Sequence, residues 1–214
     1  MLSEEEYAHL LSNQSEQLYQ KGDVIFREGA VPSGVFLIKT GKVKKYKTDR
    51  SGKEQIIYVA GEGEMIGYHA VLSEERYPDS AAALEKTLLV FIPQEDFLEV
   101  LARSPHLTRL LLKALSHEFT VFANSLSVFA QKTAQERLAI ALIVLREKFK
   151  DAGSENKEPV LNISRADLAN VAGIAEDNVI RLLKDFKNEG ILETEGRKIH
   201  IKDVRSLVKK SNYR

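Results

Sequence analysis

Charged and amide side chains recur at one-turn spacing between positions 176 and 188. Asp177 and Arg181 are four residues apart, Asn178 lies beside them, and Lys184 follows three residues after the arginine. Apolar residues of the same segment occupy the opposite face of a helix, at the i, i+3, i+4 and i+7 positions: Val179, Leu182, Leu183 and Phe186. In a DNA major groove, an arginine can donate two hydrogen bonds to guanine, a carboxylate can accept from cytosine, and an amide can pair with adenine. We therefore expect Asp177, Asn178 and Arg181 to contact bases.

The flanking residues predict the element that would position this helix. Ser164 and Asp167 form a capping box for a preceding helix, and Gly173 supplies the positive φ of a tight turn between the two helices. Gly190 is placed to end the second helix, and positions 191–201 have the pattern of two short strands around a turn. This order of elements predicts a winged helix-turn-helix.

A second group of residues is suited to phosphate contacts, which fix the register of a protein on DNA without specifying sequence. These candidates are Ser164, Arg165, Lys184, Arg197 and Lys198. Positions 160–214 hold 11 Lys and Arg against 8 Asp and Glu, whereas positions 1–159 hold 20 against 23. This modest tilt agrees with DNA binding by the C-terminal part. The alternatives are a helical hairpin with a solvated charged face, or one that mediates protein contacts only.

The N-terminal half has the residue pattern of β-strands rather than of helices. Short β-branched and aromatic runs at 24–26, 35–38, 56–59 and 88–92 are separated by glycines, which predicts a small all-β sandwich or barrel over about 18–92. We expect Lys42, Lys44 and Lys47 to form a solvated strand face. Ser3 and Glu6 suggest a capped helix at the start of the chain.

A long helix is predicted to follow, starting with Ser104 as N-cap and Pro105 as the first helical residue. Six apolar residues along it alternate at spacings of three and four, the pattern of a dimer seam: Leu112, Leu115, Phe119, Phe122, Leu126 and Phe129. A parallel stripe could pack on the chain's own β domain: Leu107, Leu111, Ala114, Val121 and Val128. The alternative is a core helix within one subunit. A second capping box, Thr133 with Glu136, predicts a break and a hinge at 131–133.

Composition excludes several classes of function. The chain has no cysteine, which rules out disulfides and cysteine-ligated iron–sulfur clusters. No apolar run is long enough for a membrane span, and the acidic N-terminus is unlike a signal peptide, so a cytoplasmic location is expected. A cupin-like metal oxygenase would need clustered ligands, but His69 is the one histidine in 18–92. No enzymatic activity is predicted.

Two motifs make the whole chain resemble the CRP/FNR superfamily of bacterial transcription regulators. The first runs from Gly22 to Gly29 and continues from Gly34 to Val43, and the second is the helix-turn-helix pattern around 164–184. The resemblance implies an α+β fold: a cyclic-nucleotide-binding-type β-roll (1–103), a dimerisation helix (104–131) and a winged helix-turn-helix DNA-binding domain (132–214). It also implies a homodimer that binds a near-palindromic duplex, contacts RNA polymerase and is gated by an effector in the β-roll.

The phosphate cassette of cyclic-nucleotide-binding members is not kept. Tyr68 stands at the position of the cassette's Glu and Asp79 at that of its Arg, and an aspartate repels a phosphate. We expect any effector pocket to involve Met65, Ile66, Gly67, Tyr68, His69, Asp79, Ser80 and Phe122. His69 lies near the position of an axial histidine in haem-containing relatives, but their accompanying cysteine is absent. No cofactor is therefore predicted. A haem-based gas sensor and an effector-independent regulator are the alternatives to control by an unknown effector.

Overall fold

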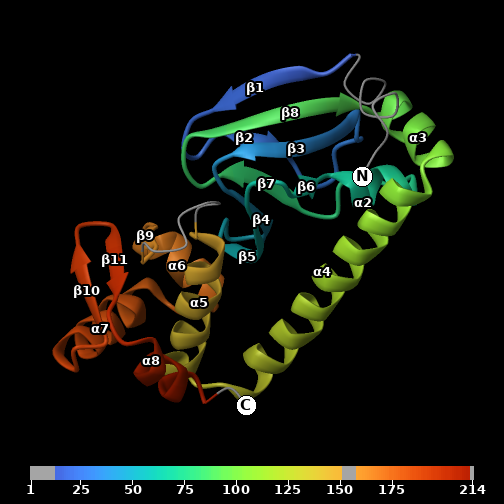
Figure 1. Cartoon of the computed structure of the whole chain (residues 1–214). Helices are drawn as coiled ribbons and strands as arrows, with labels where there is room; N and C mark the ends of the chain where they lie inside the picture. The colour runs from blue at the N-terminus through green and yellow to red at the C-terminus, as the bar shows by residue number, and fades with distance from the viewer. Residues whose placement is uncertain (1–12, 151–157, 213–214) are drawn as a thin grey trace. The chain divides into compact units, whose positions relative to one another are not determined.

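The computed structural model describes residues 13–150 and 158–212 (Figure 1). The helix expected around Ser3 and most of the polar loop expected at 151–159 lie outside these residues. The chain divides into two compact units, one formed by positions 1–47 and 58–122 and the other by 48–57 and 123–214. Among the described residues, no helix is both long and apolar enough to cross a membrane.

Two four-stranded sheets carry the β-roll. In one, β1 (Ser15–Tyr19), β8 (Thr87–Pro93), β3 (Gly34–Thr40) and β6 (Met65–Ile66) are hydrogen-bonded in that order. In the other, the order is β2 (Val24–Phe26), β7 (Ser80–Ala83), β4 (Val43–Thr48) and β5 (Glu54–Ala60). The β-domain expected from the alternating runs is confirmed.

The central pair of the first sheet is antiparallel, with Val35 opposite Ile92 and Leu37 opposite Val90. Val35, Ile92 and their neighbours are buried because β-branched and aliphatic side chains pack well on a pleated surface. Gly34 begins β3 at a point where the chains lie very close, since a Cβ there would be 2.2 Å from the Ile92 carbonyl oxygen. Only glycine allows this pairing.

Three helices complete the first unit: α2 (Tyr68–Ser73), α3 (Gln94–Arg103) and the start of α4 (Pro105–Gln131). The predicted start of α4 is confirmed, because the Ser104 hydroxyl oxygen accepts a hydrogen bond from the Leu107 backbone N–H at 3.2 Å. Leu107 and Leu111 are buried with residues of β3, β8, α2 and α3. Of the other residues of the parallel stripe, Ala114 is exposed, whereas Val121 and Val128 are half-buried.

The second unit contains α5 (Ala134–Lys148), α6 (Arg165–Ala172), α7 (Glu176–Asn188), α8 (Val204–Ser211) and a three-stranded sheet. In that sheet β11 (Lys198–Ile201) lies between β10 (Leu192–Glu195) and β9 (Val160–Asn162). Leu138, Leu142 and Leu145 of α5 are fully buried at the centre of the unit. The Thr133–Glu136 capping box is confirmed, with each residue accepting a hydrogen bond from the other's backbone N–H.

Candidate DNA-binding surface and effector site

The helix-turn-helix is held at both ends of α6. The Ser164 hydroxyl oxygen accepts from the Asp167 N–H at 3.0 Å, while the hydroxyl donates to the Asp167 carboxylate at 2.5 Å. At the other end, Gly173 adopts φ 64°, the left-handed conformation that the turn requires. A Cβ on Gly173 would lie 2.7 Å from the ring of Phe129, so the turn and this ring are in close contact.

The polar face of α7 is presented as the spacing predicts. Asp177, Arg181 and Lys184 are exposed, whereas Asn178 is half-buried. The Arg181 guanidinium donates to the Asn178 side-chain oxygen at 3.4 Å and lies 3.7 Å from the Asp185 carboxylate. Both contacts are long, and the Arg181 side chain is 61% exposed, so it can turn from these partners toward a base.

Sequence reasoning missed one residue on this face. Ile180 is 53% exposed, next to Arg181 and three residues after Asp177. An apolar side chain at this place can contact the C5-methyl group of thymine. The sequence pattern could have indicated this exposure, because Ile180 lies outside the i, i+3, i+4, i+7 positions that form the buried face of α7.

The residues expected at phosphates divide into two groups. Lys184, Arg197 and Lys198 are exposed, the last two at the tip of the wing. Arg165 is more enclosed: it donates to the Gly196 carbonyl oxygen in the wing turn at 2.8 Å. Its other terminal nitrogen, Nη1, is buried and has no hydrogen-bond partner among the described residues. Burial lowers the pKa of this guanidinium. Arg165 therefore ties the wing to α6.

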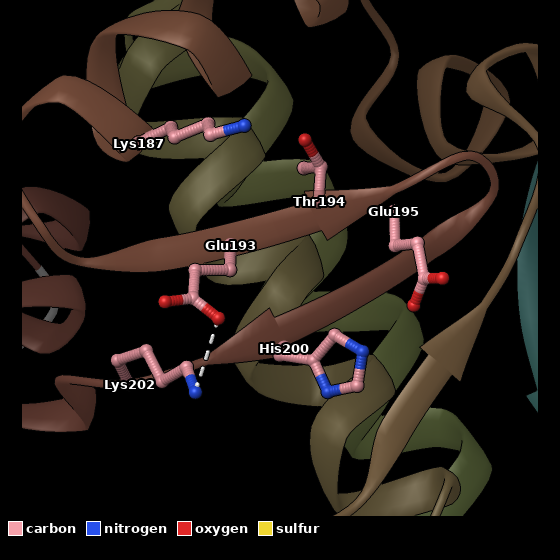
Figure 2. Close-up of a pocket in the computed structure, with 6 residues that line it drawn as sticks. All are labelled: Lys187, Glu193, Thr194, Glu195, His200 and Lys202. Carbon is pink, nitrogen blue, oxygen red and sulfur yellow. Dashed lines mark ion pairs between the residues drawn. The ribbon is translucent and has the colours of Figure 1, made fainter.

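The wing also carries a hollow of about 480 Å³, shown in Figure 2. It is lined by six residues: Lys187, Glu193, Thr194, Glu195, His200 and Lys202. The Lys202 ammonium lies 3.1 Å from the Glu193 carboxylate, so part of its charge is already paired. Among the described residues, no group of three His, Asp or Glu side chains is arranged to hold a metal ion.

The apolar stripe of α4 is exposed over most of its length. Five of its six residues are exposed to solvent in the single chain: Leu112, Leu115, Phe119, Phe122 and Leu126. Phe119 has 70% of its surface exposed. Phe129 differs, because it is half-buried against Gly173 and lies 5.8 Å from the Arg137 guanidinium. A continuous exposed apolar stripe of this kind indicates an interface.

Three residues of the expected effector pocket, Tyr68, His69 and Asp79, lie close together in the β-roll. They surround the ion pair of Lys45 with Glu118, which sequence reasoning did not predict. The Lys45 ammonium is buried, 3.6 Å from the Asp79 carboxylate and 3.1 Å from the Glu118 carboxylate of α4. The Tyr68 hydroxyl donates to Glu118 at 2.8 Å, and the His69 Nε2 lies 3.5 Å from the same carboxylate. We call these five residues the Glu118 cluster.

The other residues expected in the pocket lie elsewhere. Met65 and Ile66 pack with the two apolar cores of the β-roll, and Ser80 accepts a hydrogen bond from the Glu28 N–H at 3.0 Å. Gly67 precedes α2 with φ 83°, and Phe122 is exposed.

The expectation that Lys42, Lys44 and Lys47 form a solvated strand face is wrong in part. Lys47 on β4 is exposed, but Lys42, just before β4, is buried and lies 2.9 Å from the Glu85 carboxylate.

Burial shifts the pKa values of Asp79 and His69 in the Glu118 cluster. It raises the pKa of the Asp79 carboxyl, and the nearby ammonium of Lys45 opposes that rise. Burial and the charge of Lys45 lower the pKa of His69, while Glu118 acts in the opposite direction. His69 is therefore held in its neutral form near pH 7, with its ring stacked on Tyr68 at a centroid distance of 4.2 Å.

Comparison with known proteins identifies both units. Residues 16–104 match the cyclic nucleotide-binding domain family, and residues 136–210 match the Crp-like helix-turn-helix domain. The transcriptional activator protein Anr of Pseudomonas aeruginosa is 32% identical over 184 residues, which is 86% of this chain and 75% of that protein. The chain belongs to the CRP/FNR family.

The chain is also similar to a second regulator in sequence and to a solved structure in fold. The fumarate and nitrate reduction regulatory protein of Salmonella typhimurium is 29% identical over 188 residues, 88% of this chain and 75% of that protein. The solved structure of FixK2 from Bradyrhizobium japonicum superposes with a TM-score of 0.81 at 22% identity, covering 94% of this chain and 98% of that one. As a CRP/FNR member with a DNA-binding helix-turn-helix, the chain is a transcription regulator and not an enzyme.

Proposed function

We propose that this regulator binds a specific, near-palindromic DNA site as a homodimer. The observation that carries the proposal is the exposed face of α7, which presents Asp177, Arg181 and Lys184 from a helix fixed by a capped partner and a tight turn. In helix-turn-helix proteins the second helix lies in the major groove, and a dimer contacts two half-sites about one helical turn apart.

Each side chain has a role that follows from its chemistry. Arg181 contacts guanine, Asp177 accepts from cytosine and Asn178 contacts adenine once Arg181 has released it. Lys184, Arg197 and Lys198 neutralise phosphates, and the Ser164 hydroxyl can donate to a phosphate once Asp167 has released it. Arg165 supports the position of the wing through Gly196, and its buried Nη1 would reach a phosphate only after the side chain moves.

The exposed stripe of α4 supports the homodimer. Its helix of 27 residues is roughly 40 Å long, enough for several turns of helix–helix contact. Pairing of two such stripes would remove the exposed phenylalanine and leucine side chains from water, which is the main favourable term in association. A cytoplasmic location and contact with RNA polymerase are further proposals, and they rest on membership of the family.

We propose that control does not use a cyclic nucleotide. A cyclic phosphate in the cassette region would face the carboxylates of Asp79 and Glu118, and the one buried ammonium there is already between them. These residues do not fit an anionic ligand. The same contacts favour the effector-independent alternative over a diffusible effector. The His69 Nε2 lies 3.5 Å from the Glu118 carboxylate, so it does not resemble a free haem ligand.

Binding of purified full-length protein to DNA tests the proposal. A site enriched from random duplexes is titrated in fluorescence anisotropy, beside a scrambled duplex of equal length. We expect tight binding to the enriched site with steep salt dependence, and nonspecific binding weaker by about three orders of magnitude or more. Equal affinity for both duplexes would refute sequence-specific binding.

Sedimentation of the Phe119→Glu variant, which places a charge on the exposed stripe of α4, tests the dimer: we expect monomers. The matched control Leu18→Glu changes an exposed leucine on β1 and should leave the dimer intact.

A further inference from the structure

We propose that the Glu118 carboxylate is a built-in ligand of the β-roll, which holds α4 in the DNA-binding state without a diffusible effector. The inference rests on the proposed function, because its readout is binding to DNA. It concerns the one acidic residue in the whole of α4, which faces a buried ammonium.

The contacts of Glu118 come from two separate elements of the β-roll. Lys45 on β4 lies 3.1 Å from Oε2, and Tyr68 at the start of α2 donates to Oε1 at 2.8 Å. His69 adds a polar contact to Oε2 at 3.5 Å. Both carboxylate oxygens are thus engaged, in the way that a bound anionic ligand would be.

Lys45 has two carboxylate partners, and the nearer one, Glu118, comes from α4. The Lys45 side chain is 7% exposed, and its ammonium lies 3.6 Å from the Asp79 carboxylate, farther than from Glu118. A buried charge without a close partner is costly, so Lys45 requires the nearer carboxylate. Glu118 supplies it and thereby joins the helix to the sheet.

Glu118 lies beside the exposed apolar stripe of α4, so its contacts with Lys45 and Tyr68 also affect the orientation of that stripe. Its immediate neighbour Phe119 has 70% of its surface exposed, and Leu115 and Phe122 lie within one turn on either side. Holding Glu118 fixes the rotation of α4 about its axis and therefore the direction in which these side chains point. Diffusible effectors act in the same thermodynamic way, by favouring one of two conformations through differential contacts.

The test uses Glu118→Ala in the full-length protein, with Glu99→Gln as control. Glu99 also belongs to an ion pair, with Arg103 at 2.7 Å on α3, but this pair is exposed. We expect Glu118→Ala to weaken binding to the enriched site by about fivefold to 150-fold, the usual range of coupling between sites. The control should bind as tightly as the wild type. Cyclic AMP and cyclic GMP should change the affinity of neither protein.

Chemical rescue separates a ligand role from a merely structural one. The alanine variant leaves space beside Lys45 and Tyr68, and acetate can place a carboxylate there. We expect sodium acetate to restore DNA affinity in Glu118→Ala, whereas sodium chloride at the same ionic strength does not. Absence of rescue in a variant that unfolds cooperatively would overturn the proposal, and so would wild-type affinity without acetate.

A second variant covers the case in which alanine prevents folding. Glu118→Gln keeps the shape and an acceptor for Tyr68 but removes the charge, so it should bind DNA more weakly than the wild type and more tightly than Glu118→Ala. Equal binding by Glu118→Gln and wild type would overturn the charged-ligand role. Wild-type protein that enriches no DNA sequence would instead refute the proposed function, and the built-in ligand with it.

Discussion

Replacement of Gly173 by alanine tests the packing of the helix-turn-helix most sharply. A non-glycine residue in the left-handed conformation costs about 1–2 kcal/mol. The new Cβ would also lie 2.7 Å from one ring carbon of Phe129 and 3.1 Å from another, so the ring must move. Overpacking of this kind costs about 1–3 kcal/mol. We therefore expect Gly173→Ala to lower the free energy of unfolding by roughly 2–5 kcal/mol, the sum of the two effects.

Gly190 provides a matched control. It has φ 73°, but nothing lies within 4 Å of the position a Cβ would take, so Gly190→Ala should lose only the backbone contribution of about 1–2 kcal/mol. Because the chain has no tryptophan, urea unfolding is followed by circular dichroism. In a Phe129→Ala background the costs of the two glycine substitutions should become nearly equal, because only the flexible Gln55 side chain, with Oε1 at 3.3 Å, then remains close to the Gly173 position. Equal costs in the wild-type background would refute the contact between Phe129 and the turn.

Three further predictions concern DNA binding and charge. Arg181→Ala should weaken binding to the enriched site by about 1–3 kcal/mol and relax the preference at one base pair. Lys184→Ala should instead weaken binding to all sequences and reduce the slope of log affinity against log salt concentration by about one. Anisotropy titrations at several salt concentrations distinguish the two variants. Hydrogen bonds, chiefly from the Thr133 N–H, hold the pKa of Glu136 at about 2 in the folded chain, below its ordinary 4.5. Its stabilising effect is therefore complete above pH 4.5 and is lost as the pH falls toward 2, and Glu136→Gln should flatten this part of the stability profile in urea unfolding at stepped pH. Lys45→Met leaves the buried Asp79 carboxylate and the partly buried Glu118 carboxylate without their cation, so it should cost about 3–5 kcal/mol in the same unfolding assay; a loss below about 1 kcal/mol would show that the Lys45–Asp79 pair is not buried.

Local patterns predicted the elements that depend on near neighbours. The bounds of α7 at 176–188 follow from the apolar spacing and the terminal glycine, and both agree with the structure. The caps at Ser104, Thr133 and Ser164 depend on a hydroxyl and the next turn of backbone, so three or four residues of sequence are sufficient to specify them. Strands β2, β3, β5 and β8 were predicted for the same reason, and β4 was expected as a strand, but the burial of Lys45 on it was not.

The Glu118 cluster could not be predicted in this way. Its members come from positions 45, 68, 69, 79 and 118, and no local period connects them. The substitution of aspartate in the cassette was visible, but its partner was not, because a lysine on a strand is usually solvated. Phe129 shows the complementary difficulty. Its heptad spacing fits the α4 stripe, yet its ring contacts Gly173, and spacing alone does not say which of two neighbours an apolar side chain will meet.

Selection of binding sites from a random duplex library by the full-length protein is the decisive experiment for sequence-specific binding by α7. We expect enriched sequences with two inverted half-sites whose centres are about 10 bp apart, and a shift in preference at one position of each half-site when Arg181→Ala is used. Enrichment of no sequence, or of the same sequences by both proteins, would contradict the assignment of α7 as the helix that specifies the DNA site.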